Sequence, residues 1–422
     1  MAKKEQVPAI RFQGFADPWE QRKLSETFAF LSNNTLSRAE LSTETGPAMN
    51  VHYGDVLIKF GEYLDATKVT LPFIPSQQLV DKFKSSLLQD GDVIMADTAE
   101  DEAVGKCTEI AGIQGFQAIS GLHTIPLRPT RSFAPGYLGY YMNSDAYHDQ
   151  LLPLMQGIKV TSVSKSAILN TDISYPADSA EQVRIGRFFI QLDTLITLHQ
   201  RKYDKLVAIK RSMLEKMFPR EGSRFPEIRF AGFTDPWEQR KLSDLAEIVG
   251  GGTPDTNNSA YWDGDIDWYA PAEMEGQRYA KGSVRKITEL GLQKSSAKIL
   301  PAHRTVLFTS RAGIGKMAIL QRPAATNQGF QSLVLKDGTD PYFIYSMGER
   351  IKGMAEGVAS GSTFLEISGK MLGNLEVMVP NLKEQESIAT FFRGIDDLIT
   401  LHQRKLEKLQ AIKRSMLEKM FV

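Results

Sequence analysis

Internal duplication constrains this chain of 422 residues more than any other feature of its sequence. Residues 10–26 and 228–244 differ at three of seventeen positions, and residues 188–218 and 391–421 differ at seven of thirty-one. Self-similarity of this kind indicates repeated structural units. We therefore expect one frame to occur twice, with an insert in each copy.

The inserts divide the chain into six parts, because the segments between the repeats look unlike each other. Each half is expected to consist of an opening motif, an insert and a long helix. The ranges are 1–26, 27–180 and 181–218 in the first half, and 219–244, 245–383 and 384–422 in the second. One interpretation is that the two copies of the frame bind the same partner, whereas the two inserts bind different targets. A recent duplication with uneven drift is the alternative.

A long coiled-coil helix is predicted at the end of each half. Apolar residues recur there at gaps of three and four, which is the spacing of a coiled-coil seam. About 38 residues at a rise of 1.5 Å span roughly 57 Å, too long for one small domain to bury. We therefore expect the two helices to pack against each other as an antiparallel pair. The predicted seam residues are Ile185, Phe188, Leu192, Leu195, Leu206, Ile209, Met213, Ile388, Phe391, Ile395, Leu398, Leu409, Ile412 and Met416.

Two histidines also fall on the predicted seam, His199 and His402. We interpret them as polar positions that help to fix the register of the helices. A metal site is the alternative, but no second histidine, cysteine or paired carboxylate stands at ligand spacing beside either residue. The sequence therefore predicts no metal site.

Composition limits the classes of function. Fifty Lys and Arg balance fifty Asp and Glu, so nucleic-acid binding would depend on local patches. The only cysteine, Cys107, excludes an intramolecular disulfide. The N-terminal segment lacks the apolar core of a signal peptide, and no run approaches the eighteen or so apolar residues of a membrane helix. We expect a cytoplasmic protein without membrane contact.

Both inserts are predicted to be rich in β-structure, because short β-branched runs alternate with turn residues. Short motifs match between them despite low identity. Residues 104–106 parallel 314–316, and residues 115–117 parallel 329–331. The inserts are therefore expected to share one fold.

The second insert carries a basic stretch. Residues 278–316 contain nine Lys and Arg and one acidic residue, with aromatic and amide residues on either side. Such a mixture suits contacts to DNA phosphates and base edges, although an ordinary basic face is the alternative. The first insert is less basic. The candidate DNA-binding residues are Arg278, Lys281, Arg285, Lys286, Ser310, Arg311, Lys316 and Gln328 in the second insert, and Lys59, Lys106, Gln117, Lys159 and Thr161 in the first.

No catalytic motif is complete. Gly313, Gly315 and Ala318 match a dinucleotide fingerprint formally, but the following residues do not read as a helix. The Asn/Asp-Pro-Pro-Tyr/Phe tetrapeptide of amino-methyltransferases is absent. We therefore expect no catalytic residue and no cofactor in this chain.

An ordered set of motifs carries a resemblance to a known family. The motifs are Trp19-Glu-Gln-Arg-Lys-Leu with its copy at Trp237, Gly251-Gly-Thr-Pro, Tyr261-Trp-Asp-Gly-Asp-Ile-Asp-Trp, Thr309-Ser-Arg-Ala-Gly-Ile-Gly-Lys, Asn327-Gln-Gly-Phe, Gly361-Ser-Thr-Phe-Leu-Glu-Ile-Ser and Pro380-Asn-Leu-Lys-Glu-Gln. With both long helices, they make the whole chain resemble the specificity subunit of Type I restriction-modification enzymes. The first insert departs from the Gly-Gly-Thr-Pro pattern, so site residues transfer to it less securely.

The resemblance implies an α+β fold in which two β-rich target-recognition domains are separated by two long antiparallel coiled-coil helices with a pseudo-twofold internal repeat. Each domain would recognise one half of a split double-stranded DNA target, and the helices would set the spacer and bind two methyltransferase subunits. Restriction subunits would complete the enzyme. S-adenosylmethionine, ATP and Mg²⁺ are expected on those partner subunits. The alternatives are a coiled-coil scaffold without a DNA role and a self-sufficient methyltransferase or nuclease.

Overall fold

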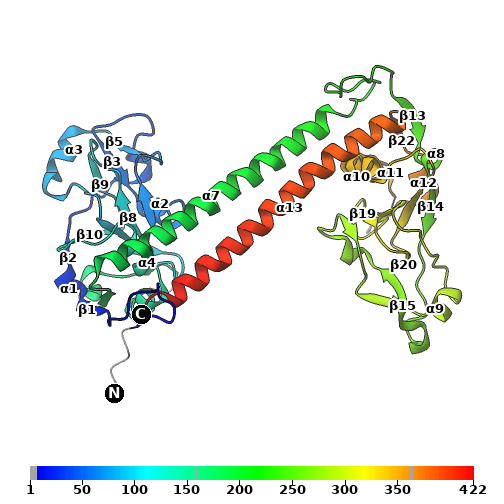
Figure 1. The fold of residues 1–422 in the computed structure, drawn as a ribbon. Coiled ribbons are helices and arrows are strands. Elements are labelled where there is room, and N and C mark those ends of the chain that lie inside the picture. Colours follow the sequence, from blue (N-terminus) through cyan, green and yellow to red (C-terminus); the bar gives the residue numbers. More distant parts are fainter. Residues whose placement is uncertain (1–6, 158, 361–364) are drawn as a thin grey trace. The chain divides into compact units, whose positions relative to one another are not determined.

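The computed structural model describes residues 7–157, 159–360 and 365–422, so part of the motif that begins at Gly361 lies outside the described residues. The chain forms two compact units (Figure 1). Unit 1 comprises residues 1–200 and 404–422, and unit 2 comprises residues 201–403. Helices α7 (Ser179–Lys216) and α13 (Leu382–Lys419) have 38 residues each. Each helix begins in one unit and ends in the other.

Unit 1 contains a five-stranded sheet with the order β2-β10-β6-β8-β4, a three-stranded sheet β5-β3-β9 and the pairs β1-β12 and β7-β11. The strands are β1 (Glu20–Lys23), β2 (Phe28–Phe30), β3 (Ala48–Val51), β4 (Tyr63–Asp65), β5 (Phe73–Ile74), β6 (Val93–Ala96), β7 (Thr98–Ala99), β8 (Cys107–Ala111), β9 (Ala118–Ser120), β10 (Thr124–Pro129), β11 (Thr161–Ser162) and β12 (Asp172–Tyr175). The short helices are α1 (Leu24–Thr27), α2 (Tyr53–Ile58), α3 (Gln77–Lys82), α4 (Tyr137–Met142), α5 (Asp145–His148), α6 (Lys165–Ile168), η1 (Arg38–Glu40), η2 (Lys84–Ser86) and η3 (Leu152–Leu154).

Unit 2 contains a five-stranded sheet with the order β14-β21-β18-β19-β16, a three-stranded sheet β17-β15-β20 and the pair β13-β22. The strands are β13 (Glu238–Lys241), β14 (Ala246–Gly250), β15 (Trp262–Tyr269), β16 (Tyr279–Ala280), β17 (Arg285–Ile287), β18 (Thr305–Phe308), β19 (Met317–Leu320), β20 (Ala324–Thr326), β21 (Gln331–Leu335) and β22 (Glu376–Val379). The short helices are α8 (Leu242–Leu245), α9 (Glu289–Gln293), α10 (Pro341–Ser346), α11 (Gly348–Val358), α12 (Gly369–Gly373), η4 (Ser259–Tyr261) and η5 (Pro271–Met274).

The two inserts have one topology. In each five-stranded sheet, three antiparallel pairings are followed by one parallel pairing, β8 with β4 and β19 with β16. Each three-stranded sheet has one antiparallel and one parallel pairing around its central strand. The predicted α+β fold with two sheet-rich domains and two long helices is therefore confirmed.

The topology tests the two matches between the inserts. Residues 104–106 and 314–316 precede the equivalent strands β8 and β19, as the sequence predicts. The second match is wrong, because residues 115–117 precede β9, whereas residues 329–331 lead into β21. Strand β9 is equivalent to β20, and β21 to β10. A shared Gly-Phe-Gln tripeptide is too short to align two divergent inserts.

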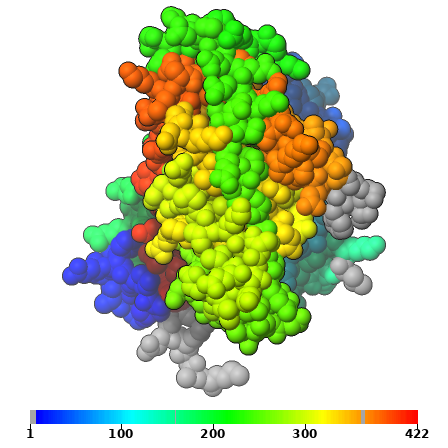
Figure 2. All heavy atoms as spheres, turned by 90° about the vertical axis from the view of Figure 1, so that its right-hand side faces the viewer, coloured from blue at the N-terminus to red at the C-terminus, as the bar shows by residue number. Residues whose placement is uncertain are grey.

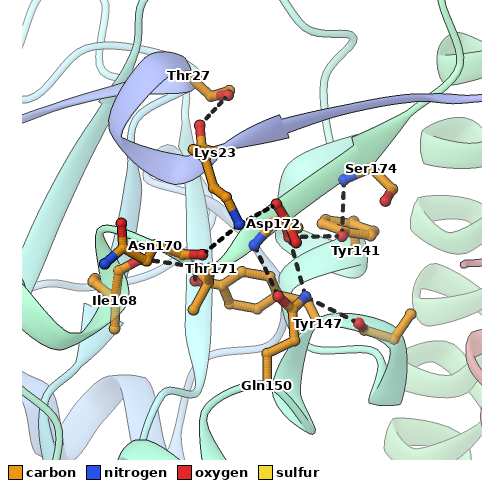
Figure 3. Close-up of polar contacts among 11 residues, drawn as sticks. Lys23, Thr27, Tyr141, Tyr147, Gln150, Ile168, Asn170, Thr171, Asp172 and Ser174 are labelled. Carbon is orange, nitrogen blue, oxygen red and sulfur yellow. Dashed lines mark hydrogen bonds and ion pairs between the residues drawn. The ribbon is translucent and has the colours of Figure 1, made fainter. Parts of the chain in front are cut away.

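The opening motif closes each insert. In unit 1, β1 pairs with β12 in antiparallel fashion, and the Nζ atom of Lys23 lies 2.8 Å from a carboxylate oxygen of Asp172 and 2.9 Å from the carbonyl oxygen of Asn170 (Figure 3). In unit 2, β13 pairs with β22 in the same way. The first and last strands of each insert are therefore hydrogen-bonded to each other, and the chain enters and leaves the domain at one place.

Each unit is completed by the end of the helix that began in the other unit. Trp19 packs against Phe421 at a ring-centroid distance of 6.3 Å, and its repeat Trp237 packs against Phe218 at 5.8 Å. The four side chains are at most 4% exposed. Since the last residues of one helix meet the first turns of the other in both units, the two helices are antiparallel. The two copies of the frame make the same contacts, which explains why their sequences are nearly identical.

The predicted seam is buried mainly near the helix starts. Ile185, Leu192, Ile388 and Ile395 are buried. Leu195 and Leu398 differ from the expectation, since they are 44% and 45% exposed. The remaining predicted residues are partly buried; they are Phe188, Leu206, Ile209, Met213, Phe391, Leu409, Ile412 and Met416. Burial is greatest near the helix starts because two neighbours, the other helix and the β-rich domain, cover the helix there.

Candidate nucleic-acid interface

The loop between β18 and β19 gathers three of the predicted residues. Thr309 ties this loop together, since its hydroxyl accepts the backbone N–H of Lys316 at 2.9 Å and bonds the carbonyl oxygen of Gly313 at 2.6 Å. Ala312 has a φ of 54°, a conformation that costs a non-glycine residue energy and is often found at functional sites. Arg311 is partly exposed at the tip of the loop. The loop is thus held rigidly in a strained shape.

Ser310 occupies a different environment in this loop. Its side chain is fully buried, and among the described residues its hydroxyl has no hydrogen-bond partner. Lys316 is half-buried, and its ammonium lies 2.8 Å from the carboxylate of Glu275. A direct contact of Ser310 with DNA would therefore require the loop to move, whereas Arg311 is accessible.

The turn that leads into β17 presents a second group of cations. The guanidinium of Arg285 lies over two indole rings, 3.7 Å from the centroid of Trp262 and 5.6 Å from that of Trp268. Lys286 and Lys281 are exposed on either side of it, and Lys286 lies 3.9 Å from Asp267. Arg285 is thus oriented by stacking rather than by an ion pair, which leaves its N–H groups available.

Among the large apolar residues that the structure describes in unit 2, Val284 is the most exposed, at 87%. Its backbone N–H donates to Glu273 at 2.7 Å, and the neighbouring Ser283 hydroxyl accepts from the backbone N–H of Trp268 at 2.8 Å. The turn is therefore fixed, although its apolar side chain points into solvent. Single exposed apolar residues are common, but here the residue stands directly beside the stacked Arg285.

Helix η5 brings the two groups together. Glu273 of η5 bonds Val284, and Glu275, which follows η5, bonds Lys316. Gln328 is exposed and its side chain bonds Thr253. Figure 2 faces unit 2 and shows the yellow-green and yellow parts of the chain, which include this basic stretch, on the visible surface.

Arg278 does not join this group. Its guanidinium donates to Asp397 of α13 at 2.5 Å and to the hydroxyl of Tyr342 at 3.2 Å. Burial alone would lower the pKa of Arg278, but these two partners raise it overall. Arg278 therefore contacts the helix side of its domain, and its charge is already balanced there.

The candidates in the first insert fall in separate places. The ammonium of Lys106 donates to the carbonyl oxygen of Leu57 at 2.7 Å, and burial lowers its pKa. Lys59 is exposed at the same end of α2 and donates to Thr70 at 3.2 Å. Gln117 is exposed beyond the far end of β8, in the loop before β9. The residues Lys159 and Thr161 lie at β11, which pairs with β7.

Comparison with known proteins agrees with this architecture. Residues 234–411 match the family model of the Type I restriction modification DNA specificity domain. The second half of the chain is therefore similar to the DNA specificity domain of Type I restriction-modification systems.

Two relatives and one solved structure illustrate what this chain is similar to. The Type I restriction enzyme MjaIX specificity subunit of Methanocaldococcus jannaschii is 35% identical over 206 residues, which is 47% of each chain. The match thus spans about half the length of that relative. The putative MjaX specificity subunit of the same organism is 21% identical over 435 positions, covering 98% of this chain and 95% of the relative. The S subunit of the Type I restriction-modification system from M. genitalium has the same fold, with a TM-score of 0.62, 12% identity and 99% of each chain covered.

Within residues 7–157, 159–360 and 365–422, no group of three or more His, Cys, Asp or Glu could hold a metal ion. No helix in the described part of the chain is both long and apolar enough to cross a membrane.

Two features near the candidate interface could not be recognised from the sequence. One is Val284, whose exposure could not be seen in the sequence; the only signal was its position inside a run of cations. The other is Glu273, which fixes the turn from an element that no motif marked. Both depend on tertiary contacts between segments that are separate in the sequence.

Proposed function

We propose that this chain is the DNA-recognition subunit of a Type I restriction-modification complex and that each β-rich domain recognises one half of a split duplex target. The observation that carries the proposal is one topology presented twice with different surfaces on a near-identical frame. Domains that share a scaffold but differ in their surface residues are suited to two different sequences in one complex.

In the second domain, the contacts to DNA come from the two groups around η5. Arg285 is stacked in place and presents a planar fork that suits the paired acceptors of guanine. Lys281, Lys286 and Arg311 supply charge for phosphate contacts, which position the domain without selecting sequence. Val284 offers an apolar contact of the kind made with the methyl group of thymine.

The helices supply two equivalent docking sites for methyltransferase subunits. The sequence Leu-Ile-Thr-Leu-His-Gln-Arg-Lys occurs at 195–202 and at 398–405. In each copy both leucines are exposed, at 44% for Leu195 and Leu198 and at 45% for Leu398 and Leu401. Identical sequences with the same exposed residues favour two copies of one partner. S-adenosylmethionine, ATP and Mg²⁺ would act on partner subunits in the cytoplasm, while this chain recognises DNA and does not catalyse.

An exchange of inserts tests the proposal. Residues 245–383 are replaced by the corresponding insert of another specificity subunit, and the complex assembled with its methyltransferase subunits is used to methylate a randomised duplex library. Sequencing of the methylated sites should show that one half-site changes and the other is retained. A change in both halves, or methylation without sequence preference, would contradict the proposal. The unchanged chain without partners serves as a control and should neither methylate nor cut.

A further inference from the structure

A partly buried polar contact joins three elements in unit 1. The hydroxyl of Tyr140 on α4 donates to Asp193 of α7 at 2.6 Å. The ammonium of Lys413 on α13 lies 2.7 Å from the same carboxylate and 2.6 Å from that of Glu62. Lys413 also lies over the ring of Tyr140, 5.5 Å from its centroid. One aspartate thus links the β-rich domain, the near helix and the far helix.

The same contact recurs in unit 2. The hydroxyl of Tyr342 on α10 donates to Asp396 of α13 at 2.7 Å, and the ammonium of Lys210 on α7 lies 2.7 Å from that carboxylate. Figure 1 shows α10 beside α13 within this unit. We call each set of three residues a latch: Tyr140, Asp193 and Lys413 in unit 1, and Tyr342, Asp396 and Lys210 in unit 2.

The origin of the residues makes the repetition informative. The aspartates and lysines are equivalent positions of the repeated helix, since Asp193 precedes Lys210 as Asp396 precedes Lys413, by seventeen residues. The tyrosines come from inserts with unlike sequences. Helix α4 follows β10 and α10 follows the equivalent strand β21, so both inserts deliver a tyrosine from the same element. Two divergent inserts have thus retained the same tyrosine contact to the repeated helix.

The latch differs physically from the apolar contacts around it. The side chain of Asp396 is 11% exposed and that of Lys413 is 18% exposed. Burial alone would lower the pKa of Lys413, but Glu62 and Asp193 raise it overall, which holds the lysine in its charged form. Apolar packing is non-directional, whereas a partly buried ion pair with a hydroxyl donor favours one geometry and leaves a poorly compensated charge if it is displaced. Polar residues in helical seams fix register in this way.

We propose that the two Tyr–Asp–Lys latches are positioning contacts that seat each recognition domain on the helix pair and thereby select the length of the gap between the two half-sites. The inference rests on the proposed function of this chain. A domain that can shift along or around its helices would reach its half-site at several gap lengths. A domain that is held by its latch would reach its half-site at one gap length.

The test compares variants of lysines that occupy equivalent positions in the two copies of the repeated helix. Lys413→Met and Lys210→Met remove the charge of each latch but keep the length of the side chain. Lys408→Met and Lys205→Met are the controls, because these exposed lysines are also equivalent to each other on the same two helices. Tyr140→Phe and Tyr342→Phe remove only a hydroxyl and provide a milder disruption should a methionine variant fail to fold.

The assembled complexes are given duplexes in which both half-sites are fixed and the gap varies by single base pairs. The wild-type complex should methylate one gap length preferentially. In the latch variants, the ratio of methylation at this gap to that at the neighbouring gaps should fall about fivefold, the factor that corresponds to roughly 1 kcal/mol. Base preferences within each half-site and the profiles of the controls should stay unchanged.

An unaltered gap profile in folded latch variants would overturn the inference, and so would a loss of activity that is equal at all gaps, which a merely stabilising contact would produce. Lys413→Arg and Lys210→Arg should restore much of the selectivity, because they keep the charge. Failure of the proposed function would look different, since the wild-type complex would then show no split target at all.

Discussion

The guanidinium of Arg285 lies 3.7 Å from the ring centroid of Trp262. The ring centroid of Trp268 lies 5.6 Å from the same guanidinium. A cation held over an indole ring gains about 0.5–1 kcal/mol at an exposed site. More important for recognition, the stack restricts the rotamers of a long side chain before DNA arrives, so less entropy is lost on binding.

Arg285→Lys should therefore relax base selection at one position of the second half-site. Lysine keeps the charge but lacks the planar fork of donors, so discrimination should fall by about 1–3 kcal/mol at one base pair. Competition binding of the assembled complex to duplexes with single base-pair changes measures this, with Arg322→Lys, an exposed arginine outside the stack, as the control. A uniform loss over all sequences would instead identify Arg285 as a phosphate contact.

Val284→Ser should abolish the preference for thymine at one position of the half-site without weakening binding to non-specific DNA. The side chain is 87% exposed on a fixed turn, and an apolar contact to a thymine methyl group would be lost with its two methyls. The measurement replaces each thymine of the half-site by uracil, which lacks that methyl group. Wild-type binding should weaken at one position, and the variant should be insensitive there. Equal sensitivity of the two proteins at every position would rule out the contact.

Leu198→Glu and Leu401→Glu should each remove one methyltransferase subunit from the complex. A carboxylate placed in an apolar contact is costly to desolvate, and the two leucines occupy the same position in the two copies of one sequence. Native mass spectrometry of purified assemblies should find one methyltransferase for each single variant and none for the double variant. Arg211→Glu and Arg414→Glu, at exposed and equivalent positions of the two helices, are matched controls that should retain both. Full occupancy in the double variant would place the docking surface elsewhere.

Glu109 should make the stability of unit 1 depend on pH. Its carboxylate is buried and accepts the backbone N–H groups of Gly136 and Gly139 at 2.6 and 2.9 Å. Burial raises the pKa of Glu109 to about 7, from an ordinary value of 4.5. The folded state then keeps a proton that the unfolded chain has released, so this group lowers the free energy of unfolding as the pH rises from about 4.5 to 7.

Glu109→Gln should remove this contribution, which amounts to about 1.4 kcal/mol for each unit of pKa difference. Urea unfolding of the full chain between pH 4.5 and 8 gives the difference in the free energy of unfolding between wild type and variant. That difference should change steadily across the window and become constant above it. Glu44→Gln, at an exposed site, should show a constant difference throughout. A flat difference for Glu109→Gln would mean that the carboxyl ionises normally in the folded state.

The sequence was sufficient for the parts of the fold that depend on repetition and periodicity. The repeats located the frame, and the gaps of three and four residues predicted both long helices and their antiparallel packing. The common topology of the inserts was expected only from short motifs, one of which misaligned them. Strand order depends on pairings between distant segments, such as β3 with β9, that leave no local trace.

The limits of the seam prediction have a physical cause. Phe189 and Phe392 are fully buried although the heptad pattern does not select them, because the β-rich domains cover a second face of each helix near its start. Leu195 and Leu398 fit the pattern and are exposed, at 44% and 45%. Periodicity identifies an apolar stripe, but it does not reveal which neighbour covers each part of that stripe.

The candidate DNA-binding residues remain predictions, but the structure separates them. Arg285 and Arg311 present accessible guanidinium groups. Arg278 is bound to Asp397, and Ser310 is buried. A count of charges along residues 278–316 could not distinguish these cases, because the distinction depends on which partner each side chain already has.

Unit 1 includes residues 404–422, which the ribosome adds only after all of unit 2 has been made. At about 5–20 residues per second, the roughly 200 residues of unit 2 take on the order of 10–40 s to synthesise. Throughout that interval Trp19, Tyr137 and Phe189 lack Phe421, which packs against all three rings in the finished protein. The unit that is begun first is therefore completed only after the other, and the nascent chain carries an open aromatic core until Phe421 emerges.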